Sequence, residues 1–419
     1  MIPGTIAATF AATLLNWMSL LFLAVGLLAH RPLLAGTGLL VLLTRGLVQL
    51  WRVHGGRNLS YRRRFVPDRV FPGQTVRFSA EVINDKPLPL PWLLIEDLVP
   101  PAARWHSGRI TERTFLSRPR LVQGMAVGWF QRVIRHYTLQ IGLRGVYSFG
   151  PAEATLSDPF GLDQQTLTLP GTDHLIVYPA LIPLPDPPVP PARPDPGRPR
   201  RGSLTEDPAR IRGVRPYQAG DSLRRVHWSA TAHLGSLQVK ELEPAVAEAA
   251  CILLDVRLSI SRAPGVPSPA DPSEWAISAA ASLYTRELAR GRRVALYGNG
   301  HMAGRGPGPG PALPPTLHPA AGAAALEALA RLNHGPVCSL EQLARRVTGR
   351  VAPGTALLVV TWAGGGDLRR CLRDCRRKGF PVQVFWIGDR PPAQWEGMRD
   401  DKIRITVLQP PPRAGSHAS

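Results

Sequence analysis

Two long apolar runs at the N-terminus constrain this chain more than any other feature of its sequence. Thr5–Ala29 carries no charged side chain, and Leu33–Trp51 is interrupted only by Arg45 near its end. A helix needs about 20 apolar residues to cross a bilayer, so each run is long enough. The short polar break between them, at residues 30–32, predicts two transmembrane helices joined by a tight turn, a helical hairpin over residues 1–53.

Arginines follow the second run directly. They are Arg52, Arg57, Arg62, Arg63 and Arg64. Because positive charge flanking a span is retained on the cytoplasmic side, the large remainder of the chain is predicted to be cytosolic. Arg31 in the turn argues weakly for the opposite orientation. A cleaved signal peptide is the alternative, but the basic segment that should precede it is missing and a second span follows at once. We expect a two-span protein of the inner or plasma membrane.

The composition limits the class of protein. At 419 residues the chain is too long for one ordinary domain, and its formal net charge of +20 is carried mostly by arginine. Membrane topology and a composition rich in Arg, Ala, Gly and Pro account for that charge. Nucleic-acid binding would need a basic face interleaved with exposed aromatic residues, which no segment shows clearly, so no nucleic-acid partner is expected. The 4 cysteines form no C-x-x-C pair and favour a reducing compartment.

Residues 65–179 have the pattern of short strands separated by Gly and Pro turns. Alternation with polar residues is seen at Val76, Phe78, Ala80 and Val82. Arg132–Ile141 alternates in the same way. This spacing predicts an all-β sandwich. Tyr147 and Phe160 are expected in its core, and no catalytic set of residues is evident there.

The second half of the chain changes character. Residues 180–203 are so rich in proline that they cannot form a helix interior or a central strand, which predicts an extended linker. From Cys251 onward strand-like runs alternate with helical patterns, which predicts a doubly wound α/β domain. This domain and the segment that introduces it occupy residues 204–408. Gly304–Pro315 is expected to be an unstructured loop, and residues 409–419 a disordered tail.

The densest mixture of charged and aromatic residues is Arg212–Glu243. Asp221 follows a glycine and is expected to cap a helix. Apolar residues then fall at helical spacing, at Leu223, Val226 and Ala230. Gly235 is the expected helix stop. Ser236–Leu242 alternates like a half-buried strand, which we expect to pair near the edge of the α/β sheet.

A spaced set of residues in this stretch resembles the signature of the bacterial domain-of-unknown-function 58 family. The set is Arg215, Tyr217, Gly220, Asp221, Arg224, Arg225, His227 and Trp228, followed by Lys240 and Glu241. Two earlier motifs, Gly145–Gly150 and Asp158–Leu162, resemble the β-domain that precedes the signature in that family. The resemblance implies a membrane-anchored protein with a von Willebrand factor A-like C-terminal domain. It also implies a role in assembling membrane or envelope complexes, often beside a MoxR-type AAA+ ATPase.

The resemblance further indicates where a metal would bind. Von Willebrand factor A domains hold a divalent cation through D-x-S-x-S after the first strand, since hard cations prefer oxygen ligands. Here Asp255 and Ser259 match that pattern, but Arg257 stands at the first serine position. A guanidinium there would pair with Asp255 and leave little need for metal. We expect no cofactor, with a weakened magnesium site as the alternative.

The signature could serve catalysis, structure or recognition. His227 with Asp221 or Glu241 could form an acid–base pair, but no nucleophile is placed beside them and the chain has no phosphate-binding P-loop. In a structural role, Trp228 would pack internally. In recognition, exposed Arg, Tyr and Trp would form an interface. We expect a non-enzymatic scaffold or adaptor for protein partners. The alternative is a divalent-metal-dependent adhesion or hydrolase module centred on Asp255, and a weaker alternative is nucleic-acid binding through the Arg-rich surface. The sequence leaves the oligomeric state open.

Overall fold

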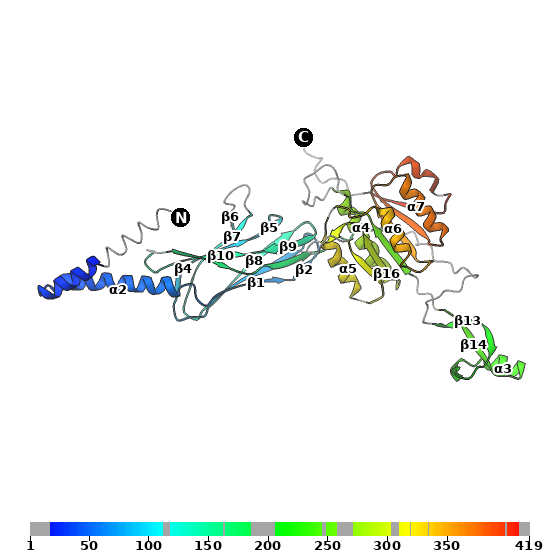
Figure 1. The fold of residues 1–419 in the computed structure, drawn as a ribbon, viewed down its shortest axis with the longest axis horizontal. Helices are drawn as coiled ribbons and strands as arrows, with labels where there is room; N and C mark the ends of the chain where they lie inside the picture. The colour runs from blue at the N-terminus through cyan, green and yellow to red at the C-terminus, as the bar shows by residue number, and fades with distance from the viewer. Residues whose placement is uncertain are drawn as a thin grey trace. The chain divides into compact units, whose positions relative to one another are not determined.

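A computed structural model of the chain describes residues 17–111, 118–161, 164–185, 206–244, 249–257, 271–302, 310–318, 320–333, 335–398 and 400–409. Contacts between residues divide the chain into two compact units, Met1–Tyr178 and Pro179–Ser419, whose elements are labelled in Figure 1. Most of the expected linker, almost all of the expected tail and residues 5–16 of the expected first span lie outside the described residues.

Apolar helices open the first unit. Helix α2 (Pro32–His54) has proline in its first turn and, among the described residues, is the helix long and apolar enough to cross a membrane. A shorter apolar helix, Trp17–Leu28, precedes it. The two helices approach through glycine, because a Cβ added to Gly38 would lie only 2.6 Å from the amide nitrogen of Leu23. Small residues at such a contact are typical of helix pairs in membranes.

Three β-sheets follow and form a sandwich-like body. The first has the order β1 (Leu59–Val66), β3 (Thr75–Asn84), β8 (Arg132–Ile141), β5 (Ala103–Trp105). The second has the order β11 (Gln164–Leu169), β10 (Ala152–Ser157), β4 (Leu90–Leu98), β7 (Arg120–Val127), β6 (Arg109–Thr111). The third joins β2 (Arg69–Val70), β12 (Asp173–Val177) and β9 (Gly145–Phe149).

The alternating pattern of this region places its core as predicted. The four alternating apolar residues of β3 are buried, namely Val76, Phe78, Ala80 and Val82. Tyr147 is half-buried, and its hydroxyl donates to the Leu143 carbonyl at 2.8 Å. The prediction for Phe160 is wrong, since its side chain is 51% exposed. It lies in the turn after β10, where its amide donates to the Asp158 carboxylate at 2.7 Å.

One arginine of the predicted membrane-flanking cluster has a different role. The Arg63 side chain is 2% exposed and donates from Nε and from its terminal nitrogen to the two oxygens of Asp97, both at 2.8 Å. The Tyr61 hydroxyl donates to the same carboxylate at 2.9 Å. Because β1 and β4 belong to different sheets, this network joins the two faces of the sandwich.

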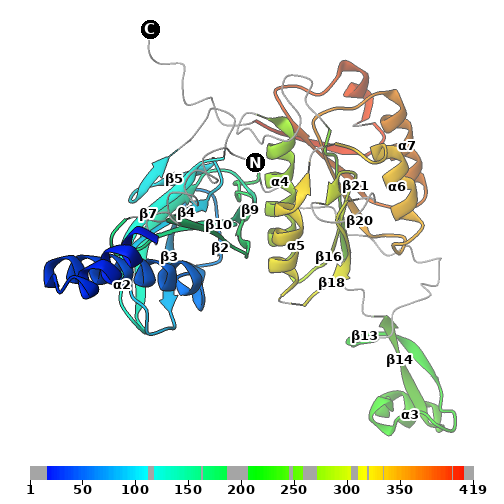
Figure 2. The ribbon, with the colours of Figure 1, turned by 60° about the vertical axis from the view of Figure 1, so that its left-hand side comes forward.

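The second unit contains a six-stranded sheet. Its order is β18 (Ala312–Thr316), β16 (Arg293–Gly298), β15 (Ala249–Leu254), β20 (Ala356–Thr361), β21 (Val382–Ile387), β22 (Arg404–Leu408). Its strands are parallel except β18. Figure 2 shows helices on both faces of this sheet. One face packs against α4 (Pro272–Ala289) and α5 (Ala321–Ala330), and the other against α6 (Leu340–Thr348) and α7 (Gly366–Arg377).

The interior of this unit largely agrees with the sequence prediction. Every residue of β15 except Ala249 is buried, as expected of a strand covered on both faces. Cys371 and Cys375 lie buried on α7 as free thiols. The expectation of an unstructured loop over Gly304–Pro315 is wrong for its last part, which enters β18. Its prolines hid the strand, but proline is tolerated in a strand at a sheet edge.

Candidate functional site

The family signature folds as a hairpin with its own small sheet. Strand β13 (Glu206–Pro216) pairs antiparallel with β14 (Gln238–Pro244), and together they form a two-stranded sheet. We call residues 206–244 the signature hairpin. The prediction that the strand after Gly235 pairs at the edge of the α/β sheet is therefore wrong. Its partner β13 was hidden from sequence reading because Pro208 and Gly213 interrupt its alternation.

An ion pair closes the loop at the tip of this hairpin. The two terminal nitrogens of Arg215 donate to the two oxygens of Asp221, each at 2.7 Å. The Gln218 amide also donates to Asp221, at 2.9 Å. Bidentate charge-assisted bonds of this kind stabilise the ionised carboxylate, so the Arg215 guanidinium and the Gln218 amide lower the pKa of Asp221 to about 2. Asp221 thus holds the loop closed.

The expected helix cap lies at a different residue. A single 3₁₀ turn, η1 (Leu223–Arg225), follows Asp221, and the α-helix α3 (Trp228–Leu234) begins later. Its N-cap is His227, whose Nδ1 accepts from the Ala230 amide at 3.1 Å. The helical spacing predicted from Leu223 onward is therefore wrong, because the chain is extended at Val226. Gly235 is confirmed as the stop, in the left-handed conformation with φ of 67°.

The cap bond argues against an acid–base role for His227. Its Nδ1 accepts the capping hydrogen bond of α3. Its backbone amide donates to the Gln238 carbonyl at 2.8 Å, which joins the loop to β14. Asp221 is held by Arg215. His227 and Asp221 therefore stabilise the fold of the hairpin.

The signature hairpin exposes several large apolar side chains and arginines. Trp228 is 69% exposed, which contradicts its expected internal packing, and Leu223 is 66% exposed. Leu234, Leu237, Arg224 and Arg225 are also exposed. Tyr217 and Lys240 are half-buried, and Glu241 is exposed. The small interior is Val226 and Val239, which form a β-bridge. We call Leu223, Arg224, Arg225, Trp228, Leu234 and Leu237 the hairpin patch.

The second cluster surrounds Asp255, directly after β15. Its carboxylate is fully buried and accepts hydrogen bonds at both oxygens. The donors are Asn299 Nδ2 at 2.7 Å, Thr361 Oγ1 at 2.9 Å and Arg257 Nε at 3.0 Å. β15 and β20 lie where the strand order reverses, the place where open α/β sheets bind ligands. Burial raises the pKa of Asp255, and the Arg257 charge and the hydrogen bonds oppose that shift.

This geometry bears directly on the metal alternative. The predicted pairing of Arg257 with Asp255 is present. A cation at Asp255 would have to displace the guanidinium, so the donor set fits an arginine better than a divalent ion. Ser259 lies outside the described residues. The first acidic residue after Thr361 is Asp367, which is exposed and pairs with Arg370 on its own helix. Within the described parts of the chain, no group of three or more His, Cys, Asp or Glu side chains could hold a metal.

Asn299 is the residue of this cluster that sequence reasoning missed. Its Oδ1 also accepts from the Val256 amide at 2.6 Å, so it fixes the backbone after β15. It follows β16 directly, just as Asp255 follows β15. That shared position after adjacent parallel strands was the signal that could have identified it.

Solved structures resemble only part of the chain. The CARDB domain of the PF1109 protein from Pyrococcus furiosus shares 13% identity over 29% of this chain and 92% of its own, with a TM-score of 0.20. A cohesin module from a Clostridium perfringens family 33 glycoside hydrolase shares 8% identity over 28% of this chain and 96% of its own, with a TM-score of 0.22. These scores are too low to support an argument about the fold.

A search of curated proteins found no match. The family model described as "Protein of unknown function DUF58" matches residues 213–308, which include most of the signature hairpin and the Asp255 stretch. The match confirms the resemblance drawn from Arg215, Asp221, His227, Trp228 and their neighbours, and over these residues the chain is similar to the DUF58 family.

Proposed function

We propose that this protein is a membrane-anchored cytoplasmic scaffold or adaptor that binds protein partners through the hairpin patch. The observation that carries the proposal is the exposure of Trp228, Leu223 and Leu234 beside Arg224 on a two-stranded hairpin. Isolated two-stranded hairpins are marginally stable in water. Trp and Arg are the residue types that dominate protein interfaces. A hairpin that places such residues outward is better explained by a partner than by internal packing.

The anchor in this proposal is a two-span hairpin made of the Trp17–Leu28 helix, extended toward the N-terminus, and α2. Support comes from the length and apolar surface of α2 and from its glycine contact with the preceding helix. The arginine flank after α2 supports a cytoplasmic location for the remainder of the chain.

The α/β body is proposed to be of von Willebrand factor A type, as the family resemblance implies. The strand order, with β18 as the antiparallel edge of an otherwise parallel sheet, supports this reading. In the proposal its cation site is replaced by the Asp255–Arg257 pair, so the domain is a non-enzymatic recognition module without cofactor. A MoxR-type AAA+ ATPase is the candidate partner, on the strength of the family resemblance.

Direct binding tests the proposal. The full-length chain in detergent micelles would be titrated with a purified MoxR-type ATPase from the same cell. The test variant is Arg224→Ala with Trp228→Ala. The matched control is Arg370→Ala with Leu317→Ala, which removes another exposed arginine and another exposed apolar side chain from the α/β body.

We expect the test variant to bind at least about 30-fold more weakly than the control, since two interface anchors contribute about 2 kcal/mol or more. Equal binding by wild type and both variants would refute the hairpin patch as the recognition site. A rise in the melting temperature of the chain at micromolar magnesium would instead favour the metal-dependent alternative.

A further inference from the structure

The end of the β-sandwich from which α2 emerges is held close to that helix. Only residues 55–58 separate α2 from β1, and four residues span at most roughly 14 Å. The Lys86 side chain donates to the Arg57 carbonyl at 2.8 Å, and the Asn58 amide group donates to the Asp85 carbonyl at 3.2 Å. A Cβ on Gly56 would lie 2.3 Å from Leu167 Cδ1. The connection is thus packed onto the sandwich.

Four aromatic side chains at this end are exposed. They are Trp92, Trp129, Phe130 and Phe160, with exposures of 66%, 70%, 66% and 51%. We call them the aromatic collar. Exposed aromatic residues gathered at one end of a domain indicate a contact surface, because scattered single exposures would be expected otherwise.

Hydrogen bonds and strand pairing link the collar to the helix exit. The Phe130 amide donates to the carbonyl of Lys86, the residue that holds Arg57. Trp92 pairs in register with Ser157. Ser157 and Asp158 line a pocket together with Trp51 and Arg52 of the last turn of α2. The Phe160 backbone amide donates a hydrogen bond to the Asp158 carboxylate. The collar therefore surrounds the point at which the apolar helix meets the sandwich.

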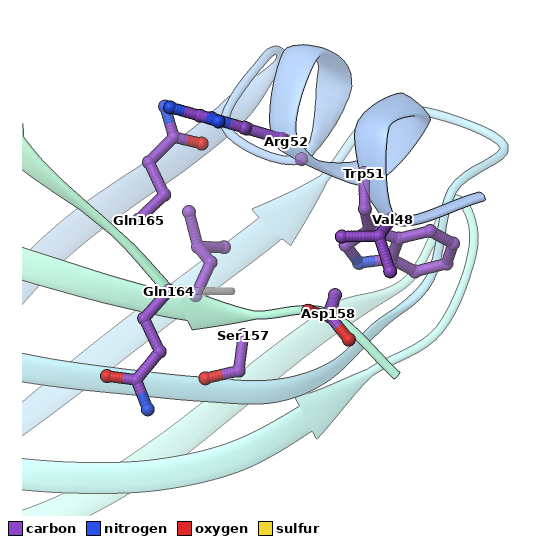
Figure 3. A pocket seen from close by; sticks show the side chains of 9 residues that line it. Val48, Trp51, Arg52, Ser157, Asp158, Gln164 and Gln165 are labelled. Atoms are coloured by element: carbon purple, nitrogen blue, oxygen red, sulfur yellow. The ribbon is translucent and has the colours of Figure 1, made fainter. Parts of the chain in front are cut away.

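The pocket at this point is small, and both apolar and polar residues line it. It has room for about one atom the size of a water oxygen, so it could receive a single oxygen of a larger group but not the whole group. Figure 3 shows Arg52, Ser157, Asp158, Gln164 and Gln165 around it, with the nitrogen edge of the Trp51 ring turned toward them.

Trp51 supplies an independent sign of a ligand. Its side chain is 7% exposed, yet its indole N–H has no hydrogen-bond partner among the described residues. Buried donors are normally paired. An oxygen acceptor from outside the chain, such as a phosphate or ester oxygen, would satisfy it.

We infer that the helix-exit end of the sandwich docks on the phospholipid bilayer, with the aromatic collar inserted at the headgroup level and a headgroup oxygen received at Trp51. The inference rests on the proposed membrane anchor. Tryptophan and other aromatic side chains are enriched at membrane interfaces because one part is apolar and the other polar. The short connection leaves the collar within reach of the interface once α2 spans the bilayer.

The test measures the depth of single positions in vesicles. Full-length chain carrying Cys338→Ser, which removes the one partly exposed native thiol among the described cysteines, receives one new cysteine and a fluorescent probe. Test positions are Trp129→Cys and Phe160→Cys. Val66→Cys is the matched control, because Val66 is exposed at the other end of β1. Leu50→Cys reports whether α2 is inserted in the bilayer. Vesicles contain phosphatidylcholine with a nitroxide near the headgroup.

We expect loss of most probe fluorescence at positions 50, 129 and 160 and little loss at position 66. Quenching at position 50 without quenching at 129 and 160 would overturn the docking and leave the anchor intact. If the chain fails to float with vesicles and position 50 stays bright, the anchor itself fails and the docking with it. Protection of 129 and 160 from aqueous iodide in native membranes, without quenching in pure lipid, would show that a protein covers the collar and would also overturn the inference.

Discussion

The chain places two arginine–aspartate pairs in opposite surroundings. Arg257–Asp255 lies at the carboxyl end of parallel strands, where the aspartate is fully buried and has three side-chain donors. Arg215–Asp221 lies at the tip of the signature hairpin, where both side chains are partly exposed. The geometry of the contact is better at the tip, with two bonds of 2.7 Å against a single nitrogen at 3.0 Å.

Contact geometry therefore does not decide what each pair contributes. A buried carboxylate without donors is strongly unfavourable, so the Asp255 pair is essential to its surroundings even though its geometry is modest. Exposed ion pairs contribute little to the stability of a whole domain, so the Arg215–Asp221 pair acts locally and fixes the conformation of its loop. The Asp255 cluster therefore stabilises the α/β domain, whereas the Arg215–Asp221 pair holds the loop at the tip of the signature hairpin.

The largest expected effect comes from Asp255→Ala. This change leaves Arg257, Asn299 and Thr361 without their common acceptor, and breaking a buried pair destabilises by about 3–5 kcal/mol. Because the Arg257 side chain is 35% exposed and can hydrate, we expect the lower end of that range. Urea unfolding of the full chain in detergent, followed by tryptophan fluorescence, measures the change.

The matched control for this experiment is Asp367→Ala. Its carboxylate is 80% exposed and pairs with Arg370 on the surface of α7, so its loss should change the unfolding free energy by at most about 0.5 kcal/mol. Equal small effects from both variants would mean that the buried pair is not structural, and the contrast between the two regions would fail.

The sequence predicted the regular parts of this fold well because their apolar periodicity reflects burial. The alternation of β3 and the continuous apolar run of β15 reappear as buried faces. Prediction failed where local pairing decides the structure. β13 contains Pro208 and β18 contains consecutive prolines, so both strands lack a strand-like pattern and exist because a neighbour supplies hydrogen bonds.

The candidate sites, too, were predictable from the sequence only in part. The pairing of Arg257 with Asp255 could be predicted because only one residue separates them in the sequence. Asn299 and Thr361 also lie at the ends of predicted strands, which is a signal in the sequence, but assigning them to the Asp255 cluster requires that their strands lie beside β15. The exposure of Trp228 and Phe160 was misjudged because composition alone makes a large aromatic residue look like core. These two exposed aromatic residues belong to the proposed functional surfaces, Trp228 to the hairpin patch and Phe160 to the aromatic collar.

A smaller, local effect is expected at the hairpin tip as pH falls. The folded pKa of Asp221 is about 2, below its ordinary value, so the stabilisation from Arg215 is fully present above the ordinary pKa and is lost as pH falls through about 2. Fluorine NMR of fluorotyrosine at Tyr217, assigned by Tyr217→Phe, would follow the opening of the loop. In Arg215→Gln the transition should move to higher pH. An unchanged midpoint would show that Arg215 does not control this carboxylate.

The smallest effect on stability is expected where the effect on binding is largest. Trp228→Ala removes a side chain that is 69% exposed, so it should change the stability of the hairpin by at most about 0.5 kcal/mol. Val239→Ala on the same module removes two buried carbons from a residue 2% exposed, and should destabilise it by about 1.6 kcal/mol. Protease cleavage within residues 206–244 measures both. Faster cleavage of Trp228→Ala than of Val239→Ala would mean that the indole packs within the hairpin, and it would remove the basis for treating Trp228 as an interface anchor.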